Sequence, residues 1–241
     1  MTIRFQTIIG ALTLAVGTFT AQAQEAPMAD HVASFIPMPA AAGQADAFAG
    51  YLADAADIVR DTEPGTVHWF GLRAGDELAI MDLFTDEAAR QAHFEGQVAA
   101  DINANAGTWV EGGWDDGVVP NVNNATVLSA RAPVDLGAAT TATYIGLQAA
   151  PGEGDALADL LTSGGAIVEE TEPGTLFWVA LRFDDARFAI FDAFADEAGR
   201  EAHFAGQVAA LLNERSAEIV EGGWEDGVVA NVRNYDILAM R

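Results

Sequence analysis

The chain has 241 residues, about half of them hydrophobic and a fifth charged, which is enough for one large core or two small ones. Its 36 acidic residues face only 11 basic ones, all arginines, for a formal net charge of −25. Such a charge repels phosphate backbones and anionic lipids, so it disfavours nucleic acid and membrane partners. The absence of cysteine excludes thiol nucleophiles, thiolate metal sites and disulfides. The excess of acidic residues is explained most simply by solubility in a salty medium. The alternative is that an acidic surface binds a cationic partner.

The first residues predict a secretory signal. The amino terminus and Arg4 give a positive start, residues 8–16 are apolar, and residues 21–23 form the small-x-small cleavage pattern Ala-Gln-Ala. The apolar stretch is too short to act as a stop-transfer helix. We therefore expect residues 1–23 to be a signal peptide cleaved after Ala23, and the mature protein to be periplasmic or secreted, with no membrane attachment after cleavage.

The remainder of the chain is a tandem duplication. Three blocks recur in order: Glu-Pro-Gly-Thr at 63–66 and 172–175, Arg-x-Ala-His-Phe-x-Gly-Gln-Val-Ala-Ala at 90–100 and 200–210, and Val-Glu-Gly-Gly-Trp at 110–114 and 220–224. The offset is 109 for the first block (172 − 63) and 110 for the second (200 − 90), so the second copy has gained one residue between them. The copies cover residues 32–131 and 141–241, with 132–140 as a linker.

Both copies predict the same elements in the same order. In the first copy these are a strand at 32–38, a helix at 44–60 ended by a Pro-Gly turn, a hairpin of strands 66–73 and 79–84, a helix from Thr85-Asp86, a loop rich in Gly and Trp, and a strand at 123–129. The second copy repeats them with strands at 141–147 and 234–240, a helix at 155–170 and a hairpin turn at 183–186. The second helix of each copy is expected to run on through Phe94, Val98 and Ile102 as one apolar face.

This order, β-α-β-β-α-β, is that of the ferredoxin-like split βαβ unit, so the fold class is α+β. The helices of such a unit cover one face of its sheet, and the other face needs a partner, for which the second copy is the obvious candidate. We expect the two copies to close into one pseudo-dimeric α/β barrel within the chain, with helices outside and room for an internal cavity. The protein is then a monomer or at most a weak homo-oligomer.

The stretches from Glu63-Pro64-Gly65-Thr66 to Ala92-His93-Phe94, and from Glu172-Pro173-Gly174-Thr175 to Ala202-His203-Phe204, resemble the antibiotic biosynthesis monooxygenase (ABM) family of dimeric α/β-barrel proteins. The resemblance implies cofactor-independent oxygenation of polycyclic aromatic or quinol substrates, while some relatives degrade haem. Haem-degrading relatives are expected to carry Asn on the first strand, where this chain has Ser34 and Thr143, which disfavours haem cleavage. Quinol-oxidising relatives place Glu on the third strand, where this chain has Asp82 and Asp192.

Hairpin register places the candidate catalytic residues. Pairing Arg73 with Leu78 puts Trp69 opposite Asp82 on one sheet face, and the second copy repeats the pair as Trp178 and Asp192, with its extra residue taken up as a bulge. His93 and His203 follow on the next helix. A base of near-neutral pKa oriented by a carboxylate suits proton removal from a phenolic substrate stacked on the indole, which is the step that lets the substrate react with dioxygen directly.

Each of these residues also has a structural interpretation. The tryptophans 69 and 178 would be core residues, the two aspartates would accept a hydrogen bond from an indole or backbone donor, and the histidines would be surface or capping residues. Trp114 and Trp224 follow a Gly pair typical of a tight turn, where they would plug the barrel edge or line a pocket mouth as ligand contacts.

The four histidines have no metal-ligand spacing, and no phosphate loop or nucleophile elbow is present, so we expect neither a metal nor another cofactor. The sequence favours a cofactor-independent monooxygenase of quinol-like or aromatic small molecules. The alternatives are a non-catalytic barrel that binds a small apolar ligand, and a structural protein with a filled barrel.

Overall fold

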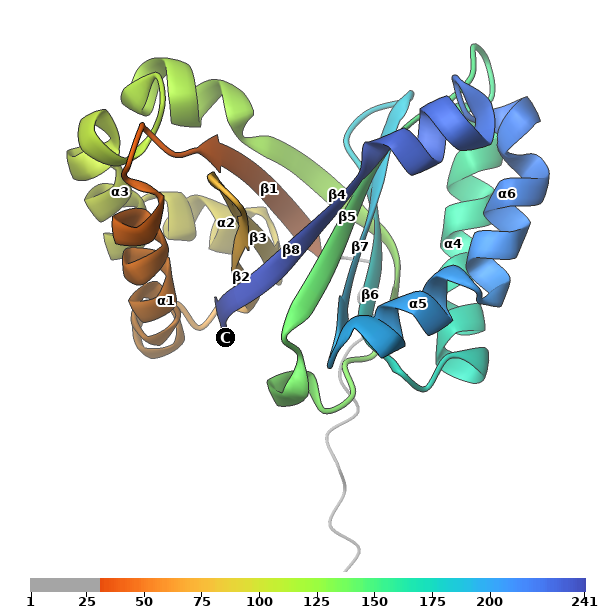
Figure 1. Cartoon of the computed structure of the whole chain (residues 1–241), viewed down its shortest axis with the longest axis horizontal. Helices are drawn as coiled ribbons and strands as arrows, with labels where there is room; N and C mark the ends of the chain where they lie inside the picture. Colours follow the sequence, from red (N-terminus) through yellow and green to blue (C-terminus); the bar gives the residue numbers. More distant parts are fainter. Residues whose placement is uncertain (1–30) are drawn as a thin grey trace, which may run out of the picture.

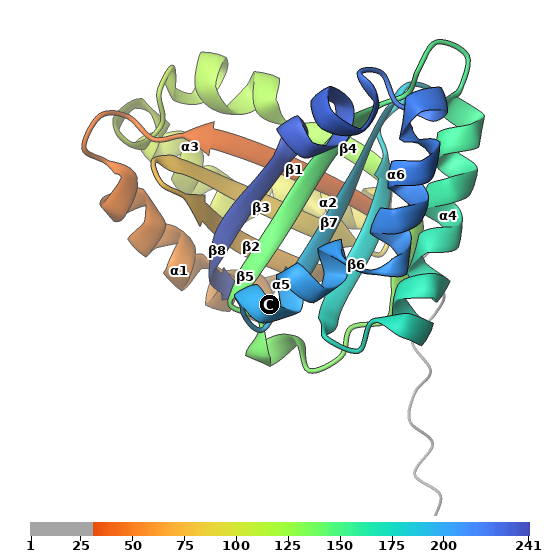
Figure 2. The ribbon, with the colours of Figure 1, turned by 45° about the vertical axis from the view of Figure 1, so that its right-hand side comes forward.

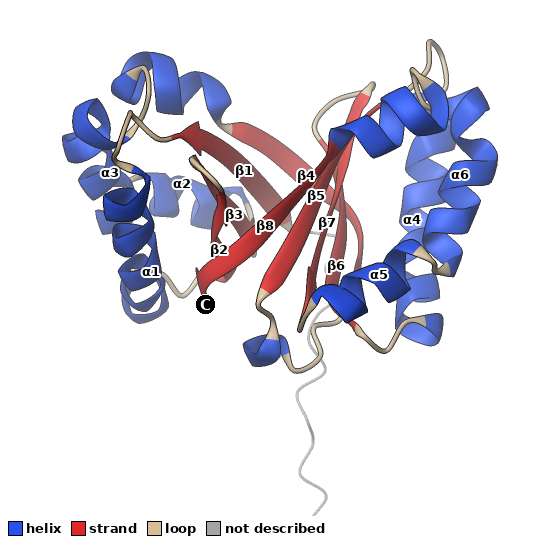
Figure 3. Cartoon of the chain, viewed as in Figure 1, coloured by secondary structure: helices blue, strands red, loops and turns tan. Residues whose placement is uncertain are grey.

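The computed structural model describes residues 31–241; the predicted signal peptide, 1–23, lies outside the described residues. Eight antiparallel strands close into one barrel in the order β1-β3-β2-β8-β5-β7-β6-β4. The helices lie outside it in two groups, one per repeat, on opposite sides of the strands (Figures 1 and 3). The predicted α+β fold, two ferredoxin-like repeats closed into an intrachain barrel, is confirmed.

Each repeat contributes four strands and three α-helices. The first contains β1 (Val32–Pro39), α1 (Ala45–Thr62), β2 (Thr66–Ala74), β3 (Glu77–Phe84), α2 (Glu87–Phe94), α3 (Gln97–Trp109) and β4 (Asn123–Arg131). The second contains β5 (Thr141–Gln148), α4 (Gly154–Thr171), β6 (Thr175–Arg182), β7 (Arg187–Phe194), α5 (Glu197–Phe204), α6 (Gln207–Ile219) and β8 (Val232–Met240). The short η4 (Leu136–Ala138) lies between the repeats.

The second helix of each repeat is broken, contrary to the sequence prediction of one continuous helix. Asp86 begins α2 by accepting a hydrogen bond from the backbone N–H of Ala89, and α2 ends at Phe94. Gly96 then caps α3 in an extended conformation, and a Cβ there would lie 2.7 Å from a carboxylate oxygen of Glu63 and 2.9 Å from the carbonyl oxygen of His93. The glycine therefore allows the chain to turn between two helices, and Phe94 does not share a helix with Val98.

The last strand of each repeat pairs with one strand of its own repeat and with one strand of the other repeat. The start of β4 pairs with β1 of its own repeat and its end pairs with β6 of the other; likewise β8 pairs with β5 and then with β2. The long diagonal path of β8 between the two halves is visible in Figure 2. The barrel is therefore closed by backbone hydrogen bonds between the repeats.

The hairpin register is as predicted, with Trp69 opposite Asp82 and Trp178 opposite Asp192. The sequence predicts that the extra residue of the second repeat forms a bulge. In the structure it instead lengthens the turn of the hairpin. Ala74 pairs with Glu77 around a two-residue loop, whereas four residues, 183–186, join β6 to β7. Both repeats carry a register shift at the other end of the hairpin, after Thr66 and after Thr175, so the shift is not the site of the insertion.

The barrel interior is filled by side chains. One buried cluster contains residues from all eight strands, and its aromatic members include Phe35, Phe70, Phe177, Phe191 and Tyr235. Phe35 stacks on Tyr144 across the repeats with ring centroids 3.9 Å apart. The sequence left room for an internal cavity in the barrel; in the structure, large aromatic residues from both halves pack against one another there.

Two further cores lie between the outer face of the sheet and the helices, one in each repeat. Trp69 and Trp178 are fully buried in these cores, beneath α1 and α4. The Trp178 ring lies so close to Gly164 of α4 that a Cβ there would be 2.5 Å from the indole. Within residues 31–241, none of the helices combines the length and the apolar character that crossing a bilayer requires.

Candidate functional site

A histidine lies between two carboxylates beneath the helices of each repeat. His203, at the end of α5, has Nδ1 2.5 Å from Oε2 of Glu172 and Nε2 3.2 Å from Oδ2 of Asp192. His93 repeats this with Glu63 at 2.5 Å and Asp82 at 3.6 Å. Both imidazoles are 3–4% exposed and both aspartates are fully buried. The structure thus brings the predicted His and Asp together in each repeat and adds a glutamate.

The local sequence explains the position of each glutamate. Glu63 and Glu172 are the C-cap residues of α1 and α4, and the proline that follows each cannot continue the helix. Their side chains also accept hydrogen bonds from Thr66 and Thr175. The repeated Glu-Pro-Gly-Thr motif thus provides a turn and a buried carboxylate with its hydroxyl partner. The Pro-Gly pair indicates the turn from the sequence alone, whereas the only signal for the buried carboxylate is the duplication of Glu63 as Glu172.

The carboxylates hold the imidazoles in their protonated form. Burial alone would lower the pKa of His203, but Asp192 and Glu172 outweigh burial and raise the pKa to about 10. The same balance raises the pKa of His93. Burial raises the pKa of Asp82 to about 7 and also raises the pKa of Asp192. At neutral pH His203 is therefore a buried cation with both ring nitrogens facing carboxylates, rather than the free base of near-neutral pKa that the sequence suggested, and the pKa of His93 is shifted in the same direction.

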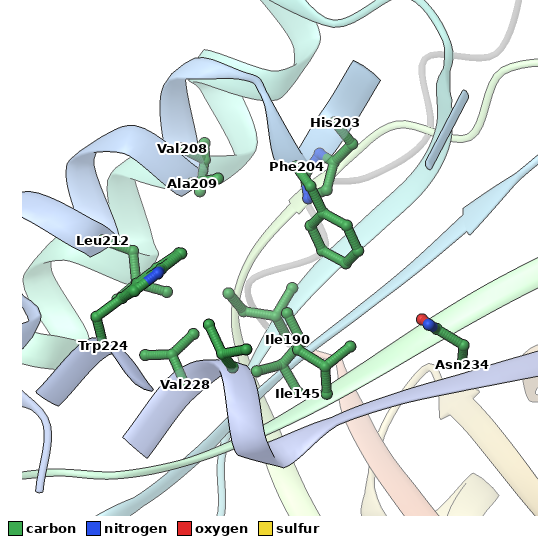
Figure 4. A pocket seen from close by; sticks show the side chains of 12 residues that line it. Ile145, Ile190, His203, Phe204, Val208, Ala209, Leu212, Trp224, Val228 and Asn234 are labelled. Atoms are coloured by element: carbon green, nitrogen blue, oxygen red, sulfur yellow. The ribbon is translucent and has the colours of Figure 1, made fainter. Parts of the chain in front are cut away.

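An open pocket lies beside this cluster in the second repeat. Its volume is about 470 Å³, and it lies between the outer face of β5, β7 and β8 and the segments α5, α6, η5 (Gly223–Val228) and η6 (Val229–Asn231). Figure 4 shows Trp224 and Phe204 on opposite sides, with Ile145 and Ile190 between them. The lining residues are mostly aliphatic and aromatic: Ile145, Ile190, His203, Phe204, Val208, Ala209, Leu212, Trp224, Val228, Val229, Val232 and Asn234.

The corresponding space in the first repeat is nearly closed, with a volume of about 40 Å³. Met38 lines it, whereas its counterpart Leu147 does not line the larger pocket. Phe94 packs inward, with its ring centroid 6.5 Å from that of Phe84, whereas Phe204 is 38% exposed. The two repeats therefore share a charge cluster but differ in the space available to a ligand.

Of the four tryptophans predicted to contact a ligand, two line a cavity and two do not. Trp114 and Trp224 follow glycines with positive φ, 81° at Gly112 and 83° at Gly222, which confirms the predicted tight turn. They do not plug the barrel edge; they cover the space between sheet and helices, and each lines the cavity of its own repeat. Trp69 and Trp178 line neither cavity, because α1 and α4 cover them. Within the described part of the chain, no group of three or more His, Asp or Glu residues is arranged to hold a metal ion.

Comparison with known proteins supports the fold assignment. No protein-family model matches the sequence, and no curated protein matches it. A candidate monooxygenase from Fusobacterium nucleatum has a similar structure, with a TM-score of 0.69 at 15% identity over 88% of this chain and 94% of that chain. A second candidate monooxygenase, from Lactobacillus acidophilus, has a TM-score of 0.66 at 10% identity over 88% and 95% of the two chains.

An anthrone oxidase-like protein is also similar, with a TM-score of 0.54 at 11% identity over 88% of this chain and 93% of that chain. These matches span nearly the whole of both chains, so the likeness extends over both repeats. The resemblance to the ABM family is thereby confirmed at the level of the fold: the chain is an ABM-like α/β barrel built from two tandem repeats.

Proposed function

We propose that this protein binds a small, mostly apolar aromatic molecule in the pocket of its second repeat. The observation that carries this proposal is the open pocket of about 470 Å³, where the first repeat has only about 40 Å³. A cavity of that size lies within the range of small-molecule sites, which are typically apolar with a few polar groups that fix orientation. Here His203 and Asn234 are the polar residues of the lining. The half-buried Trp224 offers a flat surface on which an aromatic ring can stack.

A blocking substitution tests this proposal. Ala209 lines the pocket and Ala99 is its counterpart in the closed repeat. We expect the neutral fluorescent probe N-phenyl-1-naphthylamine to bind with one site per chain, and Ala209→Phe to abolish binding by filling the pocket. Ala99→Phe is the matched control and should leave probe binding unchanged. Equal binding by the wild type and Ala209→Phe would place the probe elsewhere and refute the assignment.

Cofactor-independent oxygenation of a quinol-like or hydroxylated aromatic molecule is a second candidate function. It is favoured by the histidine on the pocket wall, which is backed by buried carboxylates able to exchange a proton. A proton passed from a phenol to this cluster would leave the electron-rich phenolate that dioxygen oxidises. Binding is the better-supported function, because both ring nitrogens of His203 face carboxylates and the ring must turn to reach a substrate.

Oxygen uptake separates the two functions. A panel of quinols and hydroxylated aromatics would be tested with the wild type, His203→Gln and the matched variant His93→Gln. Oxygenation at the second-repeat pocket predicts uptake that is lost in His203→Gln and retained in His93→Gln. Equal rates in the three proteins would remove histidine from the mechanism, and no uptake with compounds that do bind would favour the binding module.

We also propose that the protein is exported and works as a single chain. The signal pattern at 1–23 supports export, and closure of the barrel by the chain's own strands supports a monomer. Amino-terminal sequencing of protein recovered from the periplasm should begin at Gln24, and its mass in solution should be that of one chain.

A further inference from the structure

A row of polar side chains crosses the outer face of the second repeat's sheet, from the charge cluster to the pocket. Asp192 on β7 lies directly opposite Thr143 on β5, and Thr143 lies directly opposite Asn234 on β8. Directly opposed residues of antiparallel strands point to the same face, so the three side chains lie side by side beneath the helices. Asp192 and Thr143 are fully buried, whereas Asn234 is exposed at the edge of the pocket (Figure 4).

One hydrogen bond sets the orientation of the asparagine. The Thr143 hydroxyl donates to Oδ1 of Asn234 over 3.0 Å. The acceptor end of the amide is therefore occupied by the protein, while no group in residues 31–241 accepts a hydrogen bond from its NH₂. The other polar residue of the lining, His203, is a cation and offers no acceptor either. Of these two side chains, Asn234 is thus the one with a hydrogen-bond donor left for a ligand, its NH₂ group.

We propose that Asn234, oriented by Thr143, selects ligands that present a hydrogen-bond acceptor, namely a carbonyl or phenolate oxygen on an aromatic framework. This inference rests on the proposed binding function and adds the class of ligand. A ligand whose polar group is only a donor leaves the amide NH₂ unpaired when the pocket fills, which costs affinity. A ligand with a carbonyl at this position satisfies the amide, and the apolar lining covers the remainder of its surface.

The first repeat contains the same pair without the pocket. The Ser34 hydroxyl donates to Oδ1 of Asn124 over 2.7 Å, in the same register relative to Asp82. Asn124 does not line the small cavity of that repeat. The first repeat therefore provides matched control variants for each residue of the second.

Fluorenone and fluorene form the decisive probe pair, because they share one planar shape and differ by a carbonyl in place of a methylene. Equilibrium dialysis would give the dissociation constant of each. One additional neutral hydrogen bond predicts that the wild type prefers fluorenone by about fivefold beyond the solubility difference of the two compounds. Asn234→Leu should abolish this preference while still binding fluorene, and Thr143→Val should reduce it because the amide is free to turn. Asn124→Leu and Ser34→Ala should retain it.

The outcomes separate this inference from the binding proposal. Equal affinity of the wild type for both probes, or a preference that survives Asn234→Leu, overturns the role of Asn234 and leaves the binding function intact. A preference unchanged in Thr143→Val overturns the orienting role of Thr143. Failure of both probes to bind the wild type overturns the binding function and the ligand class together.

Discussion

Alkaline pH should destabilise this protein through its buried histidines. Burial lowers the pKa of His203, but Asp192 and Glu172 outweigh it and raise that pKa to about 10, whereas a histidine in an unfolded chain has a pKa of about 6.5. A raised histidine pKa stabilises the folded state fully below about pH 6.5, and this stabilisation is lost as the pH rises through about 10. Between these limits the folded cluster keeps one proton that the unfolded chain has released.

The size of the effect follows from proton linkage. One proton of difference between the two states changes the unfolding free energy by about 1.4 kcal/mol per pH unit, so the second-repeat cluster predicts a loss of about 3 kcal/mol from pH 7 to pH 9. Outside the two histidine clusters few groups titrate between pH 7 and pH 9, because the chain has no Lys or Cys and the pKa of His68 is lowered by burial to about 4.

Urea unfolding followed by tryptophan fluorescence at pH 7, 8 and 9 measures this slope. The wild type should lose stability at each step, and His203→Gln should show a shallower slope because only the first-repeat cluster, where the pKa of His93 is also raised, then contributes. Parallel slopes for the wild type and His203→Gln would refute the assignment of the proton to this cluster. A pH-independent unfolding midpoint in the wild type would do the same.

Three further tests concern packing and a hydrogen bond between the repeats. Gly164→Ala puts a Cβ 2.5 Å from the Trp178 ring and should lower the free energy of unfolding, measured by thermal denaturation, by about 1–3 kcal/mol. In the control Gly50→Ala the new Cβ has nothing within 4 Å, so this substitution should stabilise α1 by about 0.5–1 kcal/mol. Equal effects of the two substitutions would contradict the contact with Trp178. Ala99→Phe should overfill the cavity of about 40 Å³ at a cost of about 1–3 kcal/mol, while Ala209→Phe should cost clearly less by urea unfolding because its ring enters the open pocket. Tyr235→Phe removes a hydrogen bond to Glu77 between the repeats and should cost about 1–2 kcal/mol; an unchanged unfolding midpoint would show that this bond is not stabilising.

The fold could be predicted because two local signals agree throughout the chain. The duplication located the elements of one copy from those of the other, and the short turn between Arg73 and Leu78 determined which hairpin residues face each other. Because side chains alternate along a strand, that register also placed Trp69 and Asp82 on one face. The hairpin register does not indicate which face of the sheet the helices cover. The tryptophan was expected in a ligand site and instead packs beneath α1.

The site was only partly predictable because its parts meet through tertiary structure. Glu63 lies 30 residues before His93, and they meet only because α2 folds back across the start of β2. Gly96 is a local signal for the break between α2 and α3, but the reason that a glycine is needed there is tertiary, because a Cβ would lie 2.7 Å from a carboxylate oxygen of Glu63. The difference between the two cavities is subtler still, because it involves the choice between similar apolar residues such as Met38 and Leu147 and the direction of one phenylalanine ring.

Joining both halves of the barrel in one chain has an evolutionary consequence. In a homodimeric barrel every substitution appears twice, so a change that opens one pocket opens both and weakens both cores. Here β4 and β8 hold the halves together while each half carries its own sequence. The first repeat can therefore be selected for a tightly packed core while the second is selected for its ligand. Positions that the copies share then record what the barrel needs in order to fold, and positions around the pocket where they differ record where the two repeats have been free to diverge.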